Sequence, residues 1–148
     1  MNRDFVEMLS ELSASSAEFL VVGAHALAAH GLLRATGDLD IWVRADEKNA
    51  PRVLEALRRF GAPLSDLSLD DLSKPGTVFQ IGTAPARIDI LTGVSGLYFD
   101  EAWPRRMTVK IGELSVAVIG REDLIRNKRA TGRPQDLLDA DRLERHRE

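Results

Sequence analysis

Two aspartates stand one residue apart in a short apolar segment, and their spacing could hold a metal ion. Asp38 and Asp40 alternate with apolar residues in the stretch 38–43. In a β-strand, residues i and i+2 point to the same face, so both carboxylates would project together. Carboxylate oxygens are the ligands that Mg²⁺ and Mn²⁺ prefer in proteins. The pair therefore indicates a divalent-cation site on one face of a strand.

A third carboxylate could come from a neighbouring strand. Asp89 is the candidate, because it is flanked by Ile88 and Ile90 in a second apolar segment. Three carboxylates on adjacent strands could hold two Mg²⁺ ions about 4 Å apart, an arrangement that supports in-line displacement at phosphorus. Spacing alone leaves a plainer alternative open, in which the acids are only the solvated edge of a strand.

A second pair of aspartates in the chain has the same spacing in a different structural context. Asp139 and Asp141 have the same spacing but lie in a segment with helical periodicity. Residues i and i+2 of a helix are turned roughly 200° apart and cannot share a cation. The strand context therefore distinguishes the pair at 38 and 40 from the pair at 139 and 141.

A glycine turn precedes the acids in the sequence. The apolar run 19–22 predicts a buried strand, and Gly23 and Ala24 follow it at the start of a short helix. Backbone N–H groups at such a turn can bind phosphate. His25 comes next, and it would either donate a hydrogen bond to a phosphate or pack against the sheet.

Two polar residues lie just before the acids. Arg34 could neutralise triphosphate charge through its fork of donors, and Thr36 stands beside it in the same connection. The alternative for Arg34 is an ordinary surface arginine in a loop. The two acids and the glycine turn together indicate metal-assisted chemistry on a nucleotide.

The order of these motifs resembles the nucleotidyltransferase superfamily related to DNA polymerase beta. That family has Gly-Gly or Gly-Ser, a variable spacer, and then two acids alternating with apolar residues. Gly23 and Ala24 match the first motif, with alanine where the family has glycine or serine. The resemblance implies that Asp38 and Asp40 bridge two Mg²⁺ ions, and that Asp89 completes the site of the ion that activates the acceptor.

The segment 124–139 extends the resemblance to the abortive-infection toxin nucleotidyltransferases. In that group a helical lysine is followed by Arg-x-x-Asp-x-x-Asp/Glu, which Lys128, Arg133, Asp136 and Asp139 match in order. The resemblance implies that Lys128 approaches the nucleotide phosphates, that Arg133 belongs to the substrate site, and that Asp136 orients one of these cations. The alternative is a basic helix with ordinary ion pairs on a wet face.

Composition limits the classes of protein to consider. The chain has 148 residues, 44% of them hydrophobic and 29% charged, which predicts one globular domain over residues 1–148. A net charge of −3 argues against bulk electrostatic binding of nucleic acid. The sequence has no cysteine, no apolar run of the roughly 20 residues that span a bilayer, and no signal-peptide pattern. We expect no membrane contact and a cytoplasmic location.

Periodicity predicts the elements that must position these residues. With the family resemblance, these elements imply the fold class α/β (α+β): a nucleotidyltransferase fold with a mixed β-sheet, helices packed mainly on one face, and two C-terminal helices. A Gly112-Glu113 turn predicts a hairpin between the last two strands. Strands are expected at 18–23, 38–43, 78–82, 87–91, 107–111 and 114–119, and helices at 3–14, 24–30, 46–60, 97–103, 121–131 and 134–147. Pro51 is tolerated in the first turn of a helix, so the alternative for the third helix is a start nearer Asn49 than Asp46.

The resulting hypothesis is Mg²⁺- or Mn²⁺-dependent transfer of a nucleoside monophosphate from an NTP to a hydroxyl. The acceptor could be a tRNA 3′ end, a protein side chain or a small molecule such as a cationic antibiotic. The chain could act as the toxin of a toxin–antitoxin pair, with a cognate antitoxin or a second copy as partner. The rival is a catalytically inactive binding protein with this fold; Ala24 favours the rival, and the intact set of three acids opposes it.

Overall fold

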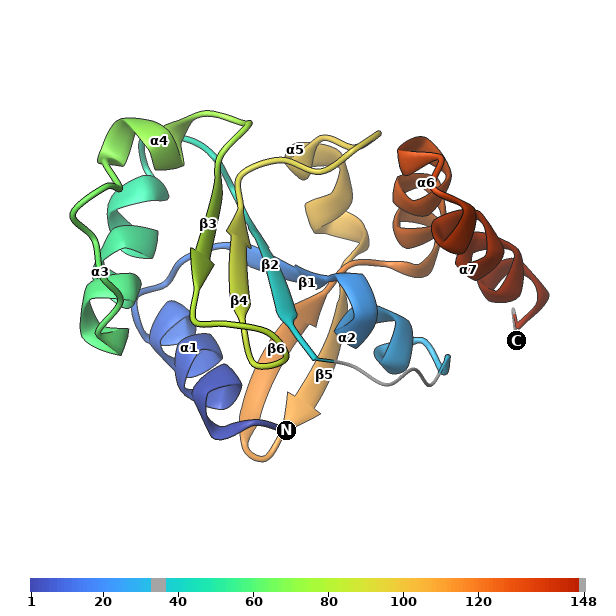
Figure 1. Cartoon of the computed structure of the whole chain (residues 1–148), viewed down its shortest axis with the longest axis horizontal. Helices are drawn as coiled ribbons and strands as arrows, with labels where there is room; N and C mark the ends of the chain where they lie inside the picture. Colours follow the sequence, from blue (N-terminus) through green and yellow to red (C-terminus); the bar gives the residue numbers. More distant parts are fainter. Residues whose placement is uncertain (33–36, 147–148) are drawn as a thin grey trace.

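The centre of the protein is a mixed β-sheet. The computed structural model describes residues 1–32 and 37–146, and in that part of the chain six strands pair in the order β3-β4-β2-β1-β6-β5 (Figure 1). The predicted strands are all present. Their bounds are β1 Phe19–Val22, β2 Leu39–Val43, β3 Val78–Ile81, β4 Ile88–Leu91, β5 Met107–Ile111 and β6 Leu114–Val118.

The pairing of the strands determines which side chains meet. The central β2 runs antiparallel to β1 and parallel to β4. The outer strands β3 and β5 are antiparallel to β4 and β6, and β1 pairs with β6 in parallel. In the register between β2 and β4, Asp40 lies opposite Asp89. The two acids, distant in sequence, are therefore neighbours across the sheet.

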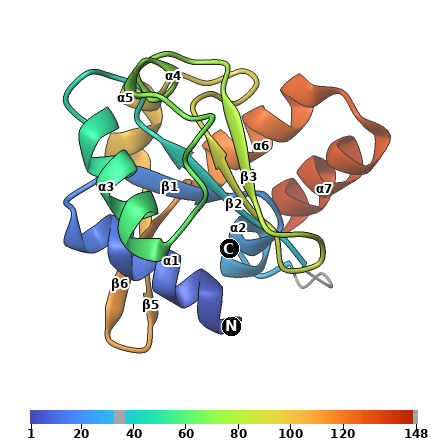
Figure 2. The ribbon, with the colours of Figure 1, turned by 60° about the vertical axis from the view of Figure 1, so that its left-hand side comes forward.

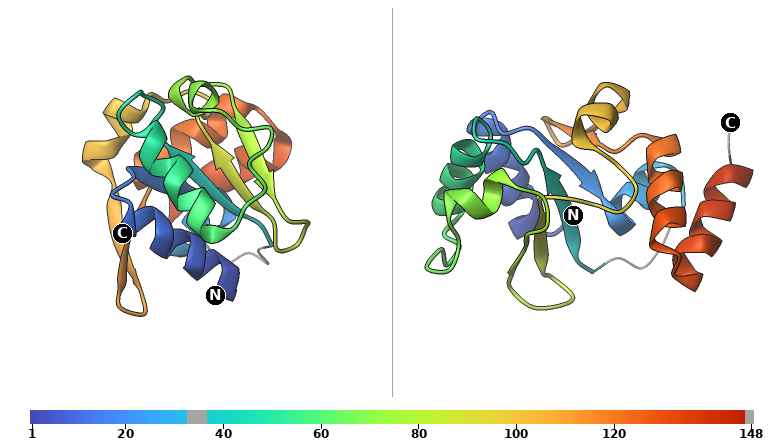
Figure 3. Two further views of the ribbon diagram at one scale, coloured as in Figure 1. Left: turned by 90° about the vertical axis from the view of Figure 1, so that its left-hand side faces the viewer. Right: turned by 90° about the horizontal axis from the view of Figure 1, so that it is seen from above.

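Helices cover one face of the sheet and form a wall on the other side. In Figure 1 and in the turned view of Figure 2, α1 (Arg3–Ala14), α3 (Ala50–Phe60) and α4 (Leu69–Ser73) gather on the same side. The right-hand view of Figure 3 shows α6 (Arg121–Thr131) and α7 (Pro134–Arg145) together on the opposite side. The remaining helices are α2 (Gly23–Ala29), α5 (Phe99–Ala102) and the 3₁₀ turn η1 (Trp103–Arg105).

The apolar stripe of α1 packs this helix into the hydrophobic core. Phe5, Met8, Leu9 and Leu12 recur at helical spacing, and all four are at most 3% exposed. Burial of a large apolar side chain contributes roughly 1.5–3 kcal/mol relative to leaving it exposed. The predicted bounds of α1 and α6 agree with the structure. None of the helices in residues 1–32 and 37–146 is both long and apolar enough to traverse a bilayer.

Two predicted helices differ from the structure by more than small shifts at their ends. The helix expected from residue 46 begins at Ala50, because the Asp46 carboxylate accepts a hydrogen bond from the Asn49 backbone N–H (2.7 Å) and closes a turn first. Pro51 then lies in the first turn, where its missing N–H costs nothing. The helix expected at 97–103 is instead α5 followed by η1, which includes Pro104.

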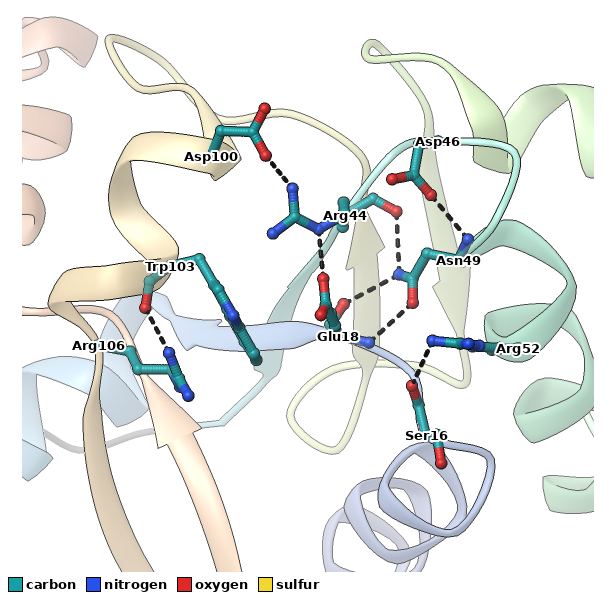
Figure 4. Close-up of polar contacts among 9 residues, drawn as sticks. All are labelled: Ser16, Glu18, Arg44, Asp46, Asn49, Arg52, Asp100, Trp103 and Arg106. Carbon is teal, nitrogen blue, oxygen red and sulfur yellow. Dashed lines mark hydrogen bonds and ion pairs between the residues drawn. The ribbon is translucent and has the colours of Figure 1, made fainter.

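Asn49 ties the start of β1 to the end of β2 (Figure 4). Its side chain is buried, with 2% of its surface exposed, and both accepts and donates hydrogen bonds. The Oδ1 atom accepts the Glu18 N–H (2.8 Å), while Nδ2 donates to the carbonyls of Glu18 and Arg44 (3.0 Å each). Three backbone groups thus depend on one amide.

Replacing Asn49 with alanine is expected to lower the free energy of unfolding by roughly 2–4 kcal/mol, because buried backbone groups lose their partners. Chemical denaturation measures this loss. The matched control is Asn127→Ala, which removes a single exposed bond to the Ser95 carbonyl and should cost less than about 1 kcal/mol. Equal losses in the two variants would contradict the structural role assigned to Asn49.

Candidate functional site

A cleft of about 580 Å³ lies between the sheet and the helical wall of α6 and α7. It gathers side chains from β2, β4, α2, α6 and the segments that join them. Its lining residues are Val22, Gly23, Ala24, Asp38, Asp40, Val78, Arg87, Asp89, Leu91, Gly93, Val94, Ser95, Asn127, Lys128, Thr131, Arg133 and Asp136. Most of the predicted site residues are therefore in one place.

The three predicted acids face one another in this cleft. Burial, the Asp89 charge with a shared hydrogen bond, and the Asp38 charge together raise the pKa of Asp40 from 3.8 to about 6; the Arg87 charge opposes them. Asp89 itself is only 7% exposed. Carboxylates this close repel one another when ionised, so the cluster favours either a proton or a cation.

Arg87 lies against two of these acids, and the sequence analysis did not single it out. Its guanidinium donates to Asp89 through Nε (2.8 Å) and Nη2 (3.2 Å), and Nη2 also lies 3.2 Å from Asp38 Oδ2. Its backbone N–H donates to Asp38 Oδ1 (3.0 Å). The i, i+2 spacing of Arg87 and Asp89 along one strand was the signal that could have revealed this pairing.

The oxygen-only donor set fits a hard divalent cation such as Mg²⁺ or Mn²⁺. As they stand, no three His, Cys, Asp or Glu side chains within residues 1–32 and 37–146 form a ready metal-binding group. The carboxylates of Asp38 and Asp89 face Arg87 instead. Binding a cation here would thus require Arg87 to release those oxygens.

Gly23 allows the acid of β2 to approach the turn before α2. Its φ is +71°, in the left-handed region that favours glycine. A Cβ built at this position would lie 2.3 Å from Asp40 Oδ2, well inside van der Waals contact. Only glycine therefore fits between β1 and Asp40, and Ala24 follows it on the cleft wall.

Lys128 and Asp136 form the centre of a polar cluster on the opposite wall. Both residues are 8% exposed, and Lys128 Nζ lies 3.1 Å from Asp136 Oδ1. The other oxygen of Asp136 accepts from Thr131 Oγ1 (2.6 Å) and Arg133 Nε (2.8 Å). Asp139 adds a carboxylate 3.5 Å from Lys128 Nζ.

These bonds outweigh the effect of desolvation on Asp136. Burial alone would raise the pKa of its carboxyl, but hydrogen bonds from Thr131, Lys128 and Arg133 hold that pKa below the usual value of 3.8. Asp136 therefore contacts both Lys128 and Arg133. Thr131 was missed by the sequence analysis, because a threonine at the end of a helix carries no distinctive pattern.

Asp136→Asn is expected to reduce the free energy of unfolding at pH 7 by about 1–3 kcal/mol, since Lys128 would keep its burial but lose a charged partner. Because the pKa is lowered by folding, this contribution exists above the unfolded pKa and disappears as pH falls through the folded one. Urea denaturation at pH 7 and pH 3 measures both effects. The exposed Asp141→Asn is the control and should change stability by less than about 0.5 kcal/mol.

One predicted site residue, His25, does not line this cleft, and two others cannot be placed from the described part of the chain. His25 is absent from the lining; its ring packs edge-on against Phe5 (5.5 Å between centroids), and its Nε2 atom is buried without a hydrogen-bond partner. Burial lowers the pKa of this imidazole. The packing alternative thus describes His25, and its assignment to the substrate site is corrected. Arg34 and Thr36 lie outside the described residues.

Comparison with known families identifies the chain. Residues 1–147 match a family profile described as "Nucleotidyl transferase of unknown function (DUF2204)". The chain belongs to this nucleotidyltransferase family. The match spans both the acids of the sheet and the Lys128 cluster, so all the cleft residues named above lie within it.

Solved structures support the same fold. A candidate nucleotidyltransferase from Thermotoga maritima superimposes with a TM-score of 0.64, covering 98% of this chain and 92% of its own, at 13% sequence identity. At that identity the likeness shows the fold and not the substrate. None of the curated proteins compared with the chain matches it in sequence.

Proposed function

We propose that the cleft transfers a nucleoside monophosphate from an NTP to a hydroxyl in a reaction that depends on Mg²⁺ or Mn²⁺. The observation that supports this most directly is the opposition of two charge sets. Asp38, Asp40 and Asp89 line one side of the cleft, and Lys128 and Arg133 line the other. This arrangement can hold cations and triphosphate oxygens at once.

The acidic and the basic residues of the cleft would have different roles in this reaction. Asp38, Asp40 and Asp89 would hold the cations, which polarise the phosphate and activate the acceptor hydroxyl. Lys128 and Arg133 would bind phosphate oxygens, and Asp136 would keep both cations directed. The acceptor oxygen forms a bond to the α-phosphorus, the bond to pyrophosphate breaks, and the hydroxyl proton passes to water.

The acceptor would be a tRNA 3′ end, a protein side chain or a small molecule, and a toxin role would add a cognate antitoxin as partner. The second candidate function is binding of a ligand without catalysis. The ion pairs of Arg87 with Asp38 and Asp89 favour this non-catalytic function, because a guanidinium that stays bound to both carboxylates would take the place of the metal ion.

Calorimetry with Mg²⁺ or Mn²⁺ and each NTP tests the proposal on the wild type and on Asp89→Asn. The expected result is NTP binding that needs the metal and weakens at least tenfold in the variant. Asp66→Asn, an exposed acid outside the cleft, is the control and should bind as the wild type does. Metal-independent binding in all three proteins would instead support the non-catalytic candidate.

The same titration has a predicted pH dependence. Because the pKa of Asp40 is about 6, its carboxyl must lose a proton before a cation can bind. Metal-dependent NTP binding should therefore strengthen between pH 5 and 7 and release protons as it does so. Calorimetry in buffers of different ionisation enthalpy measures that release, and a flat pH profile would contradict the assignment of Asp40.

A further inference from the structure

A second cavity of about 310 Å³ opens beside the cleft of the three acids. Gly93 and Val94 line both spaces, so the two are contiguous. Trp42, also in the lining, stands two residues after Asp40 on β2 and thus points to the same face of the sheet. A molecule in this cavity would reach toward the acids from the far end of β2 and β4.

The cavity offers aromatic and apolar surface. Its floor includes Trp42, 1% exposed, and Phe99, whose ring meets Trp42 edge-on at 5.1 Å. Tyr98 stands at the rim and is 75% exposed, although most large hydrophobic residues of this protein are buried. An exposed aromatic ring beside a cavity is suited to stacking against a flat ring of a ligand.

The charges of the lining favour a cation over a polyanion. Arg44 is the single basic residue among the described lining residues, and its guanidinium is bound to Glu18 and Asp100 (Figure 4). The same guanidinium lies over the Phe99 ring, 4.7 Å from its centroid. The carboxylate of Asp100 remains 86% exposed, and Asp46 adds a second acid. A phosphate-rich acceptor would find no unpaired cation here.

We propose that this cavity is the acceptor subsite, and that it binds a small hydroxyl-bearing molecule with a ring that stacks on Tyr98 and an ammonium group that pairs with Asp100 or Asp46. The inference rests on the proposed transferase function, because it names the class of acceptor for that reaction. The acceptor hydroxyl lies toward Gly93 and Val94, where the cavity meets the cleft. The acidic lining of the cavity disfavours nucleic acid as the acceptor.

NMR spectroscopy of the full ¹⁵N-labelled chain tests this subsite directly. The chain has two tryptophans, and both report on the cavity: Trp42 lines it, and Trp103 stacks on Phe99 at 5.5 Å. The probes are tyramine, which has a ring, a hydroxyl and an ammonium group, 4-ethylphenol, which lacks the ammonium group, and a short RNA ending in CCA. Each is titrated with and without a saturating mixture of NTP and Mg²⁺.

Tyramine is expected to shift the Trp42 indole signal saturably and with undiminished affinity when NTP is present. Binding of 4-ethylphenol should be at least fivefold weaker, and the RNA should leave the signal unchanged. Tyr98→Ala should weaken tyramine binding roughly five- to tenfold through lost stacking and leave NTP binding intact. Leu138→Ala, which truncates an exposed side chain on α7, is the control and should alter neither.

The outcomes separate this inference from the proposed function. A Trp42 shift caused by the RNA, equal binding of both phenols, or displacement of tyramine by NTP overturns the cationic acceptor subsite. Metal-dependent NTP binding without tyramine binding overturns the subsite alone. Tyramine binding without metal-dependent NTP binding overturns the transferase, and with it the acceptor role of the cavity.

Discussion

Asp40→Asn is expected to abolish metal-dependent NTP binding and, at the same time, to stabilise the fold at neutral pH. The binding loss follows from removing the carboxylate that lies opposite Asp89 across the sheet and against the Gly23 turn. We expect nucleotidyl transfer to fall by at least a hundredfold, as is typical when a group essential to transition-state charge is removed. The gain in stability follows from the charge repulsion that Asp89 and Asp38 exert on Asp40.

The sign of the stability change follows from the pKa of Asp40. Folding raises that pKa from 3.8 to about 6, so the protonated carboxyl is stabilising, and this contribution is fully present below pH 3.8. It is lost as pH rises through about 6, where the ionised group repels its neighbours. An asparagine stays neutral, and the variant should exceed the wild type by roughly 1–2 kcal/mol at pH 7.5, after allowance for solvent screening.

Thermal and urea denaturation at pH 4 and pH 7.5 measure the effect. The two proteins should be alike at pH 4 and differ at pH 7.5, and added Mg²⁺ should reduce the difference by stabilising only the wild type. Asp66→Asn is the control for loss of an exposed negative charge. A variant that is less stable than the wild type at pH 7.5 would contradict the repulsion assigned to this cluster.

Gly23→Ala is expected to disrupt the site and to destabilise the fold. The added Cβ would lie 2.3 Å from Asp40 Oδ2, and the residue would keep a φ of +71° that alanine rarely adopts. We expect a loss of about 2–4 kcal/mol in unfolding free energy, of which roughly 1–2 kcal/mol comes from the backbone conformation. Asp40 must also move away, so metal-dependent NTP binding should weaken at least tenfold.

Gly112→Ala is the matched control, because it separates the two contributions. Gly112 has a similar φ of +63°, but a Cβ there would meet nothing within 4 Å. Its loss should be about 1–2 kcal/mol, with NTP binding unchanged. Differential scanning calorimetry measures the stability of both variants, and NTP titration measures their binding. Equal losses of stability would show that contact with Asp40 does not contribute to the effect of Gly23→Ala.

Local sequence patterns determined most of the elements. The apolar spacing of residues 3–14 predicted α1 with its bounds, and alternation with apolar neighbours placed both Asp40 and Asp89 on strands. These predictions succeed because helical and extended periodicities differ, and burial of one face enforces them. The family resemblance then supplied the expectation that the acids belong to one site, and the parallel register of β2 and β4 brings them together.

Only the tertiary structure determined which charged side chains and which cavities lie beside the three acids. The bond of Arg87 to Asp38, the exclusion of His25 from the cleft and the place of Thr131 depend on contacts between segments up to 49 residues apart. The cavity under Tyr98 likewise forms only where the loop after β4 meets the end of β2. A sequence pattern specifies the face on which a side chain lies, whereas its partner across the sheet depends on strand register and helix packing, which are set by the whole core.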